Sequence, residues 1–131
     1  MLKRPVTVRP DMTIYEAAHE ILANRISGVC VVDDDNNLVG MLSELDCLRA
    51  IVDTAYNDNE PYGSKVEDLM TRQVDVNHVD EDIVGVASQM LDKRQRRRPI
   101  VENGKLVGQV TCRQILKAAK DFLGPEDPTE R

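Results

Sequence analysis

The sequence predicts a mixed α/β (α+β) fold in which two β-α-β-β-α repeats pack sheet to sheet about a pseudo-twofold axis. A first observation is a recurring helix face, since 14–22 and 83–91 both carry apolar residues at i, i+3, i+4, i+7 and i+8. The two helix faces are 69 residues apart, and the same spacing relates the apolar pairs at 31–32 and 100–101. A single unit of about 60 residues is marginally stable alone, so the two sheets are expected to cover each other.

Each repeat is predicted to begin with a short strand, at 7–8 in the first repeat and 75–76 in the second. A helix follows each strand. Thr13 with Glu16 three residues later has the pattern of a capping box. Asp82 occupies the equivalent position before the second of these helices and is a favourable N-cap residue.

A hairpin and a second helix complete each repeat. The hairpin links are predicted at 33–37 and 102–105, where the second is one residue shorter and the spacing falls to 68. Asn103-Gly104 suits a two-residue turn that requires positive φ. The closing helices are expected at roughly 44–55 and 112–122.

A polar stretch containing Pro61 and Gly63 predicts a connection between the repeats. Ser64 and Glu67 after it are expected to open a short helix. The predicted organisation is a first repeat at 1–55, a connecting segment at 56–65, a second repeat at 66–123 and a flexible tail at 124–131.

The composition restricts the function classes. The 131 residues include 3% aromatic residues and no Trp, so base stacking on aromatic side chains is nearly excluded. A net charge of −6 argues against a nucleic-acid or anionic-membrane binder. No apolar run approaches about 18 residues, and no signal-peptide core follows the first four residues. We therefore expect a cytoplasmic protein with no membrane contact.

The chemistry-bearing residues give no sign of an enzyme. Cys30, Cys47 and Cys112 are odd in number and form no CxxC, so reduced thiols are predicted rather than disulfides or a zinc site. His19 and His78 have no partner at metal-ligand spacing, so no metal site is predicted. Nucleophile-elbow, zinc-protease, P-loop and Gly-rich dinucleotide motifs are all absent.

Three segments carry a family resemblance, at 26–48, 68–76 and 96–116. Their ordered duplication resembles a tandem cystathionine-β-synthase (CBS) domain pair, or Bateman module, of the free-standing prokaryotic type. The resemblance implies a cytoplasmic homodimer that binds an adenosine-containing ligand between its repeats and signals to a separate regulated protein. The implied ligand is AMP, ADP, ATP, NAD or S-adenosylmethionine, and no cofactor is required.

Ser43 and Asp46 match the ribose-binding motif of that family. A carboxylate at this position accepts hydrogen bonds from both vicinal hydroxyls of a ribose. The same two residues also have the pattern of a helix cap, and one turn can serve both purposes. In the second repeat, Thr111 is followed by Gln114 instead of an aspartate, so the resemblance implies a doubtful second cleft there. The resemblance places Thr7, Ile26 and Ser27 in that cleft.

Five of the six residues from Lys93 to Arg98 are basic, on an otherwise acidic protein. The resemblance implies that Arg96, Arg97 and Arg98 bind ligand phosphates, while Met70, Thr71 and Gln95 lie on the adenine side. Guanidinium groups match phosphate oxygens well. A solvated basic turn is the alternative interpretation, and a nucleic-acid patch is disfavoured by the overall charge.

Two hypotheses of different classes follow. The first is a regulatory sensor for an adenosine-containing ligand bound at Asp46, supported by the intact Ser43 and Asp46. The second is a ligand-free structural module for dimerisation or protein interaction, favoured by Gln114.

Overall fold

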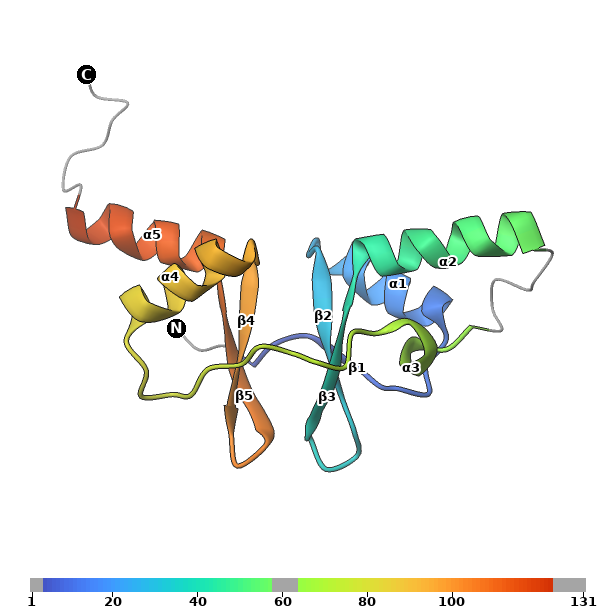
Figure 1. Cartoon of the computed structure of the whole chain (residues 1–131), viewed down its shortest axis with the longest axis horizontal. Helices are drawn as coiled ribbons and strands as arrows, with labels where there is room; N and C mark the ends of the chain where they lie inside the picture. Colours follow the sequence, from blue (N-terminus) through green and yellow to red (C-terminus); the bar gives the residue numbers. More distant parts are fainter. Residues whose placement is uncertain (1–3, 58–63, 124–131) are drawn as a thin grey trace, which may run out of the picture.

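The computed structural model describes residues 4–57 and 64–123. Strands of both repeats lie at the centre, and helices lie outward at either end (Figure 1). The elements of the first repeat are β1 (Thr7–Val8), α1 (Ile14–Ala23), β2 (Gly28–Val32), β3 (Leu38–Ser43) and α2 (Glu44–Asn57). Those that follow are α3 (Val66–Leu69), α4 (Ile83–Lys93), β4 (Arg97–Glu102), β5 (Lys105–Thr111) and α5 (Cys112–Leu123).

The two sheets differ in one strand. In repeat one the order is β1-β2-β3, with β1 parallel and β3 antiparallel to β2. In repeat two only β4 and β5 form a sheet, and the strand predicted at 75–76 is absent. Its place is taken by a single parallel bridge between Asn77 and Ile100, where the Asn77 backbone makes two hydrogen bonds of 2.9 and 3.0 Å. This bridge corresponds to the pairing of Val8 with Val31, so the topology of the repeats is shared.

Local sequence signals explain most helix ends and turns. Thr13 and Glu16 form the predicted capping box at α1, and the Asp82 carboxylate accepts a hydrogen bond from the Gly85 N–H at α4. Asn103 and Gly104 adopt φ values of 52° and 80°, which confirms the predicted turn. Helix α2 extends two residues beyond its predicted end, to Asn57.

The predicted start of the short helix at Ser64 is wrong. Helix α3 begins at Val66 after an N-cap at Lys65. The Ser64 carbonyl accepts a hydrogen bond from the Ile14 N–H instead of from an N–H of the helix, so Ser64 lies outside it. Positions 58–63 of the predicted connection and the whole predicted tail at 124–131 lie outside the described residues.

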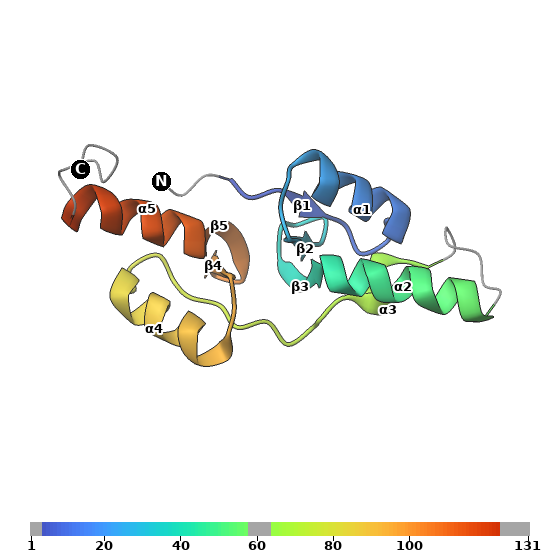
Figure 2. The ribbon, with the colours of Figure 1, turned by 90° about the horizontal axis from the view of Figure 1, so that it is seen from above.

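The repeats meet through their hairpins and one apolar cluster. The Leu38 N–H donates to the Gly104 carbonyl and the Leu106 N–H donates to the Asn36 carbonyl, at 3.1 and 3.0 Å. Beside these bonds, buried Cys30, Val32 and Leu106 form an apolar cluster that contains residues of both repeats. Seen from above, α1 and α2 lie at one end of the molecule, and α4 and α5 at the other (Figure 2). The predicted packing of sheet against sheet is confirmed.

The cores of the two repeats are unequal. The repeat-one core consists of Val8, Ile14, Ala17, Ile21, Val29, Val31, Leu42, Cys47, Ala50, Val66 and Met70, with Val6, Met12, Ala18, Ile26, Val39 and Leu69 packed against it. The segment of α3 and its C-cap, although predicted to open the second repeat, therefore packs on the core of the first. The repeat-two core consists of Val86, Met90, Ile100 and Val110, with Ile115 packed against it. Apolar burial therefore stabilises repeat one more strongly than repeat two.

The three cysteines differ in burial, which predicts their reactivity. Burial raises the pKa of the Cys30 thiol to about 11. Burial also raises the pKa of Cys47, and the nearby Asp46 and Glu44 charges add to that effect. Cys112 is exposed. Because the thiolate is the reactive form, we expect a disulfide reagent at pH 8 to modify one thiol rapidly in the native protein.

Substituting Cys112→Ser should abolish this rapid reaction, and unfolding in denaturant should then expose the other two thiols. Rapid modification of more than one thiol in the native protein would contradict the burial of Cys30 and Cys47.

Candidate functional site

A cavity of about 640 Å³ lies between the two repeats. We call it the inter-repeat cavity. It is lined by residues 27–28, 41–46, 71, 73–75 and 94–97. Its walls therefore come from β2, from the junction of β3 and α2, from the segment before α4, and from the start of β4.

The Ser43–Asp46 turn forms one wall of this cavity. The Ser43 N–H donates to Asp46 Oδ2 at 2.9 Å, and the Asp46 N–H donates to Ser43 Oγ at 3.1 Å. This reciprocal pair caps α2, so the cap interpretation is confirmed. Arg49 Nη1 donates to Asp46 Oδ1 at 3.2 Å, but the Arg49 side chain is 63% exposed and the pair contributes little. Each carboxylate oxygen accepts more than one hydrogen bond, so a capping Asp46 retains acceptor capacity toward the cavity.

The rest of the cavity lining comes from the segment after α3, at residues 71 and 73–75, and from the segment after α4, at 94–97. Thr71 is fixed against β3 by two backbone hydrogen bonds with Met41, of 2.8 and 2.9 Å. Gln95 Nε2 donates to Asp75 Oδ2 at 2.8 Å, and Gln95 Oε1 accepts from Arg98 Nε at 2.6 Å. The side-chain amide of Gln95 is therefore held at both ends.

Arg97 carries positive charge into the cavity wall from a half-buried position. Its Nη2 donates to Ser27 Oγ at 3.2 Å and its Nη1 to Gln109 Oε1 at 3.4 Å, and both acceptors are neutral. Burial lowers the pKa of Arg97, although a guanidinium stays protonated throughout the ordinary pH range. Exposed Arg96 lines the same cavity. The two residues place positive charge on this wall.

The structure brings together six of the predicted site residues. Ser43, Asp46, Thr71, Gln95, Arg96 and Arg97 all line the inter-repeat cavity. Ser27, which the resemblance placed in the second cleft, lines this cavity as well.

Two predicted residues are placed elsewhere. Met70 is only 9% exposed and packs in the repeat-one core, so an adenine-side role does not fit. Arg98 is 4% exposed and lines a smaller cavity of about 330 Å³ beside α4. Successive residues of a strand point to opposite faces, so Arg97 faces the inter-repeat cavity while Arg98 faces α4. A phosphate role for Arg98 therefore does not fit either.

Four of the residues predicted for the second cleft have other contacts in the structure. Thr111 and Gln114 make a reciprocal cap at α5, with hydrogen bonds of 3.1 and 3.2 Å. Ile26 packs against the repeat-one core, and Thr7 pairs with Cys30 in the sheet. None of these four lines either of the two cavities described above.

Sequence reasoning missed Asp75 as a site residue, because it was assigned to a strand. The hydrogen bond from Gln95 lowers the pKa of the Asp75 carboxyl, and the charges of Lys93 and Arg98 act in the same direction. An ionised Asp75 thus adds an acceptor to the wall that carries Arg96 and Arg97.

Within 4–57 and 64–123, no three His, Cys, Asp or Glu side chains are grouped to hold a metal ion. None of the helices described there has the length and apolarity to cross a bilayer.

Comparison with known proteins explains the duplicated architecture. The CBS domain family model matches residues 1–53 and again residues 66–121. The chain is a tandem CBS-domain pair. One match falls on each repeat, and the gap between them, residues 54–65, begins within α2 and ends directly before α3.

The CBS pair has relatives in larger proteins. It is 32% identical over 117 residues to the uncharacterized protein MJ1225 of Methanocaldococcus jannaschii. The aligned region covers 89% of this chain and 40% of MJ1225. It is also 35% identical over 121 residues to the inosine-5'-monophosphate dehydrogenase of the same organism. That alignment covers 92% of this chain and 23% of the enzyme. The chain thus spans less than half the length of either relative.

Solved structures of CBS pairs have the same fold. A structure of CBSX2 in complex with AMP superimposes with a TM-score of 0.81 at 28% identity, covering 92% of this chain and 90% of that one. The CBS pair of protein MJ0100, in complex with 5'-methylthioadenosine and S-adenosyl-L-methionine, gives a TM-score of 0.76 at 30% identity, covering 95% and 92%.

Proposed function

We propose that this CBS pair is a regulatory module that binds an adenosine-containing ligand in the inter-repeat cavity. The observation that carries the proposal is that side chains of both repeats, Asp46 on one wall and Arg96 and Arg97 on the other, line one cavity. The AMP complex of CBSX2 and the 5'-methylthioadenosine and S-adenosylmethionine complex of MJ0100 support this ligand class.

The cavity offers hydrogen-bonding or charged groups for the ribose, the phosphate and the base of such a ligand. Ribose hydroxyls donate to the Asp46 carboxylate, which the cap at Ser43 holds toward the cavity. Phosphate oxygens accept from the guanidinium groups of Arg96 and Arg97. The base lies near Thr71 and Gln95. AMP, ADP, ATP, NAD and S-adenosylmethionine are the candidates, and the module requires no catalytic cofactor.

Because the ligand touches both repeats, its binding energy depends on how they sit against each other. A ligand that prefers one arrangement shifts the population toward it. We propose that this shift is the signal to a separate regulated protein, and that the module itself performs no catalysis.

A homodimer in the cytoplasm remains a prediction from the sequence. Exposed apolar side chains on the outward helices support a second copy as the cover, because burial against another chain would remove them from water. They include Leu45, Leu48, Ile51 and Val52 in α2, and Leu116 and Phe122 in α5.

The test is a thermal shift of the protein with each candidate nucleotide and with S-adenosylmethionine, followed with a dye because the chain contains no Trp. At a free ligand concentration of about 100 times Kd, binding stabilises the protein by about 2.7 kcal/mol, which raises Tm by several degrees. In Asp46→Ala we expect the affinity to fall about tenfold or more, because the ribose loses its charged acceptor.

Gln114→Ala is the matched control. It removes the equivalent helix cap in repeat two, so both variants should lose about 1 kcal/mol of stability. Only Asp46→Ala should lose the ligand shift. No shift with any ligand on a folded wild-type protein would overturn the sensor and favour the ligand-free structural module. Binding through the basic residues to nucleic acid would instead appear as a steep dependence on salt that does not need Asp46.

A further inference from the structure

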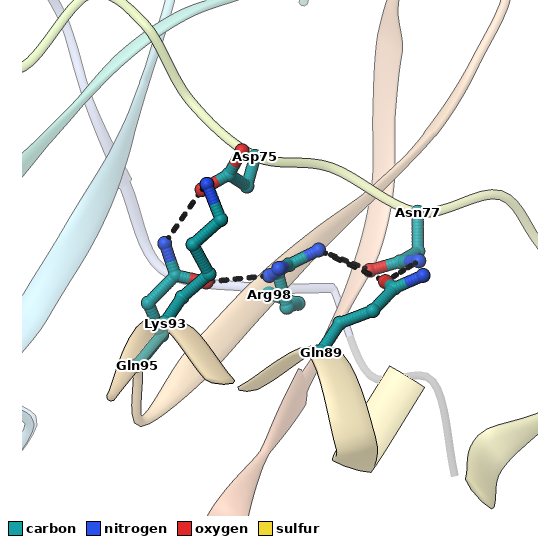
Figure 3. Close-up of polar contacts among 6 residues, drawn as sticks. All are labelled: Asp75, Asn77, Gln89, Lys93, Gln95 and Arg98. Carbon is teal, nitrogen blue, oxygen red and sulfur yellow. Dashed lines mark hydrogen bonds and ion pairs between the residues drawn. The ribbon is translucent and has the colours of Figure 1, made fainter. Parts of the chain in front are cut away.

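Repeat two contains a polar network around the buried guanidinium of Arg98 (Figure 3). Arg98 Nη1 donates to Asn77 Oδ1 at 3.0 Å and to Gln89 Oε1 at 3.1 Å, and its Nε donates to Gln95 Oε1 at 2.6 Å. Gln95 continues the network to Asp75. Every side-chain hydrogen bond of Arg98 thus goes to a neutral amide oxygen, and no carboxylate forms an ion pair with it within the described residues.

The fold itself does not require this network, because repeat one builds the same region from apolar residues. The pairing of Asn77 with Ile100 repeats that of Val8 with Val31, and the pairing of Arg98 with Val110 repeats that of Val29 with Leu42. Asn77 Nδ2 also donates to the Glu81 carboxylate, which adds Glu81 to the network. By the same correspondence, Asp75, Asn77, Glu81, Gln95 and Arg98 stand where repeat one has Val6, Val8, Met12, Ile26 and Val29, whereas Gln89 stands where it has Glu20. The five apolar residues belong to the repeat-one core or pack against it.

A buried polar network is a poor way to stabilise a core, since apolar residues of similar volume often serve as well or better. Its presence in one repeat only points to a role beyond folding. The network touches the inter-repeat cavity at two residues, Gln95 and Asp75, whereas Arg98 does not line that cavity. Arg98 therefore acts on the cavity wall indirectly, through its hydrogen bond to Gln95 and through its charge near Asp75.

Arg98 fixes which way the Gln95 amide points. A guanidinium has only donors, so the Gln95 oxygen must face Arg98 Nε. The Gln95 nitrogen must then face the Asp75 carboxylate, to which it donates. One N–H of Gln95 Nε2 is used in that bond, and no second partner of Nε2 lies within hydrogen-bond distance in the described chain. The cavity wall thus offers a donor from Gln95 beside an acceptor from Asp75.

We propose that Arg98 is a positioning residue that holds Gln95 and Asp75 as an ordered donor–acceptor pair for the edge of an adenine base. This inference rests on the proposed binding of an adenosine-containing ligand. Adenine presents an N6 amino donor beside a ring-nitrogen acceptor, which complements an acceptor at Asp75 and a donor at Gln95. Hypoxanthine has a carbonyl in place of the amino group, so it presents an acceptor where adenine presents a donor.

The test compares the dissociation constants of AMP and IMP, which share ribose and phosphate and differ in the base. We expect the wild-type protein to prefer AMP by about tenfold or more, because the hypoxanthine carbonyl would face the Asp75 carboxylate, acceptor against acceptor, with no hydrogen bond between them. In Arg98→Lys, which keeps a positive charge but removes the Nε donor, the preference should fall to about threefold or less. In the Gln95→Ala background, adding Arg98→Lys should change the ratio no further.

Arg96→Lys is the matched control. It alters a residue of the phosphate wall, so it should weaken AMP and IMP alike and leave their ratio unchanged. If Arg98→Lys does not fold, Gln95→Glu tests the donor of the pair that Arg98 is proposed to hold. A glutamate retains an acceptor for Arg98 but has no donor for the ring nitrogen, so it should also lose the preference for AMP.

A ligand-free measurement separates the positioning step from ligand binding. In the nuclear magnetic resonance spectrum, the Gln95 side-chain amide resonances should shift in Arg98→Lys and stay in place in Arg96→Lys. Unchanged Gln95 resonances in Arg98→Lys, or an unchanged ratio of AMP to IMP affinity, would overturn the role of Arg98. A wild-type protein that binds neither nucleotide would overturn base recognition together with the proposed function.

Discussion

Replacing Val29 by arginine is expected to lower the free energy of unfolding by about 3–5 kcal/mol, the typical penalty for an uncompensated buried charge. That is a large part of the whole stability of a small domain, about 5–15 kcal/mol. Val29 is 1% exposed and lies in the repeat-one core. Its counterpart in repeat two is Arg98, which is buried as well but donates to three amide oxygens. The same residue type is thus tolerated at one of two equivalent positions and not at the other.

The measurement is a urea unfolding curve followed by circular dichroism. Val29→Met is the control, because it adds volume without charge and should be less destabilising, by about 1–3 kcal/mol. If Val29→Arg proved as stable as Val29→Met, the repeat-one core would be able to supply partners or water to a guanidinium. The contrast drawn between the two repeats would then be wrong.

The features that the sequence predicted well are set by local chemistry. The capping box at Thr13, the N-cap at Asp82 and the turn at Asn103-Gly104 each depend on residues within a few positions of one another. The duplication was equally visible, because helix periodicity repeats along the chain. The strand predicted at 75–76 depended instead on pairing with a distant segment. In the structure, Asn77 makes a single bridge there and no strand forms.

The site residues show the same division. Asp46 was found because the Ser43–Asp46 motif is local and the cap it forms points into the cavity. Arg98 was misplaced because the basic run was read without strand alternation, which turns Arg97 and Arg98 to opposite faces. The signal that would have placed Arg98 correctly was present in the alignment of the repeats, where it falls on Val29, a residue of an apolar strand.

Gly40→Ala is expected to damage stability and ligand binding together. A Cβ at Gly40 would lie 2.6 Å from Met70 Sδ and 2.9 Å from the Thr71 carbonyl oxygen. Met70 can move its flexible end, but the Thr71 carbonyl is backbone and is held by the Met41 N–H at 2.9 Å. We expect a loss of stability at the upper end of about 1–3 kcal/mol for such overpacking. Thr71 lines the inter-repeat cavity, so its displacement should also weaken AMP binding severalfold.

Gly85→Ala separates this close approach from the general effect of replacing a glycine. Gly85 lies in α4, where a Cβ would meet nothing nearer than Asp82 Oδ2 at 4.0 Å. Alanine should stabilise that helix by about 0.5–1 kcal/mol and leave AMP affinity unchanged. Thermal unfolding and AMP titration of both variants provide the measurement. A Gly40→Ala protein that kept wild-type stability would mean that Thr71 can withdraw from β3 freely. If it also kept AMP affinity, the wall at Thr71 would have no part in holding the ligand.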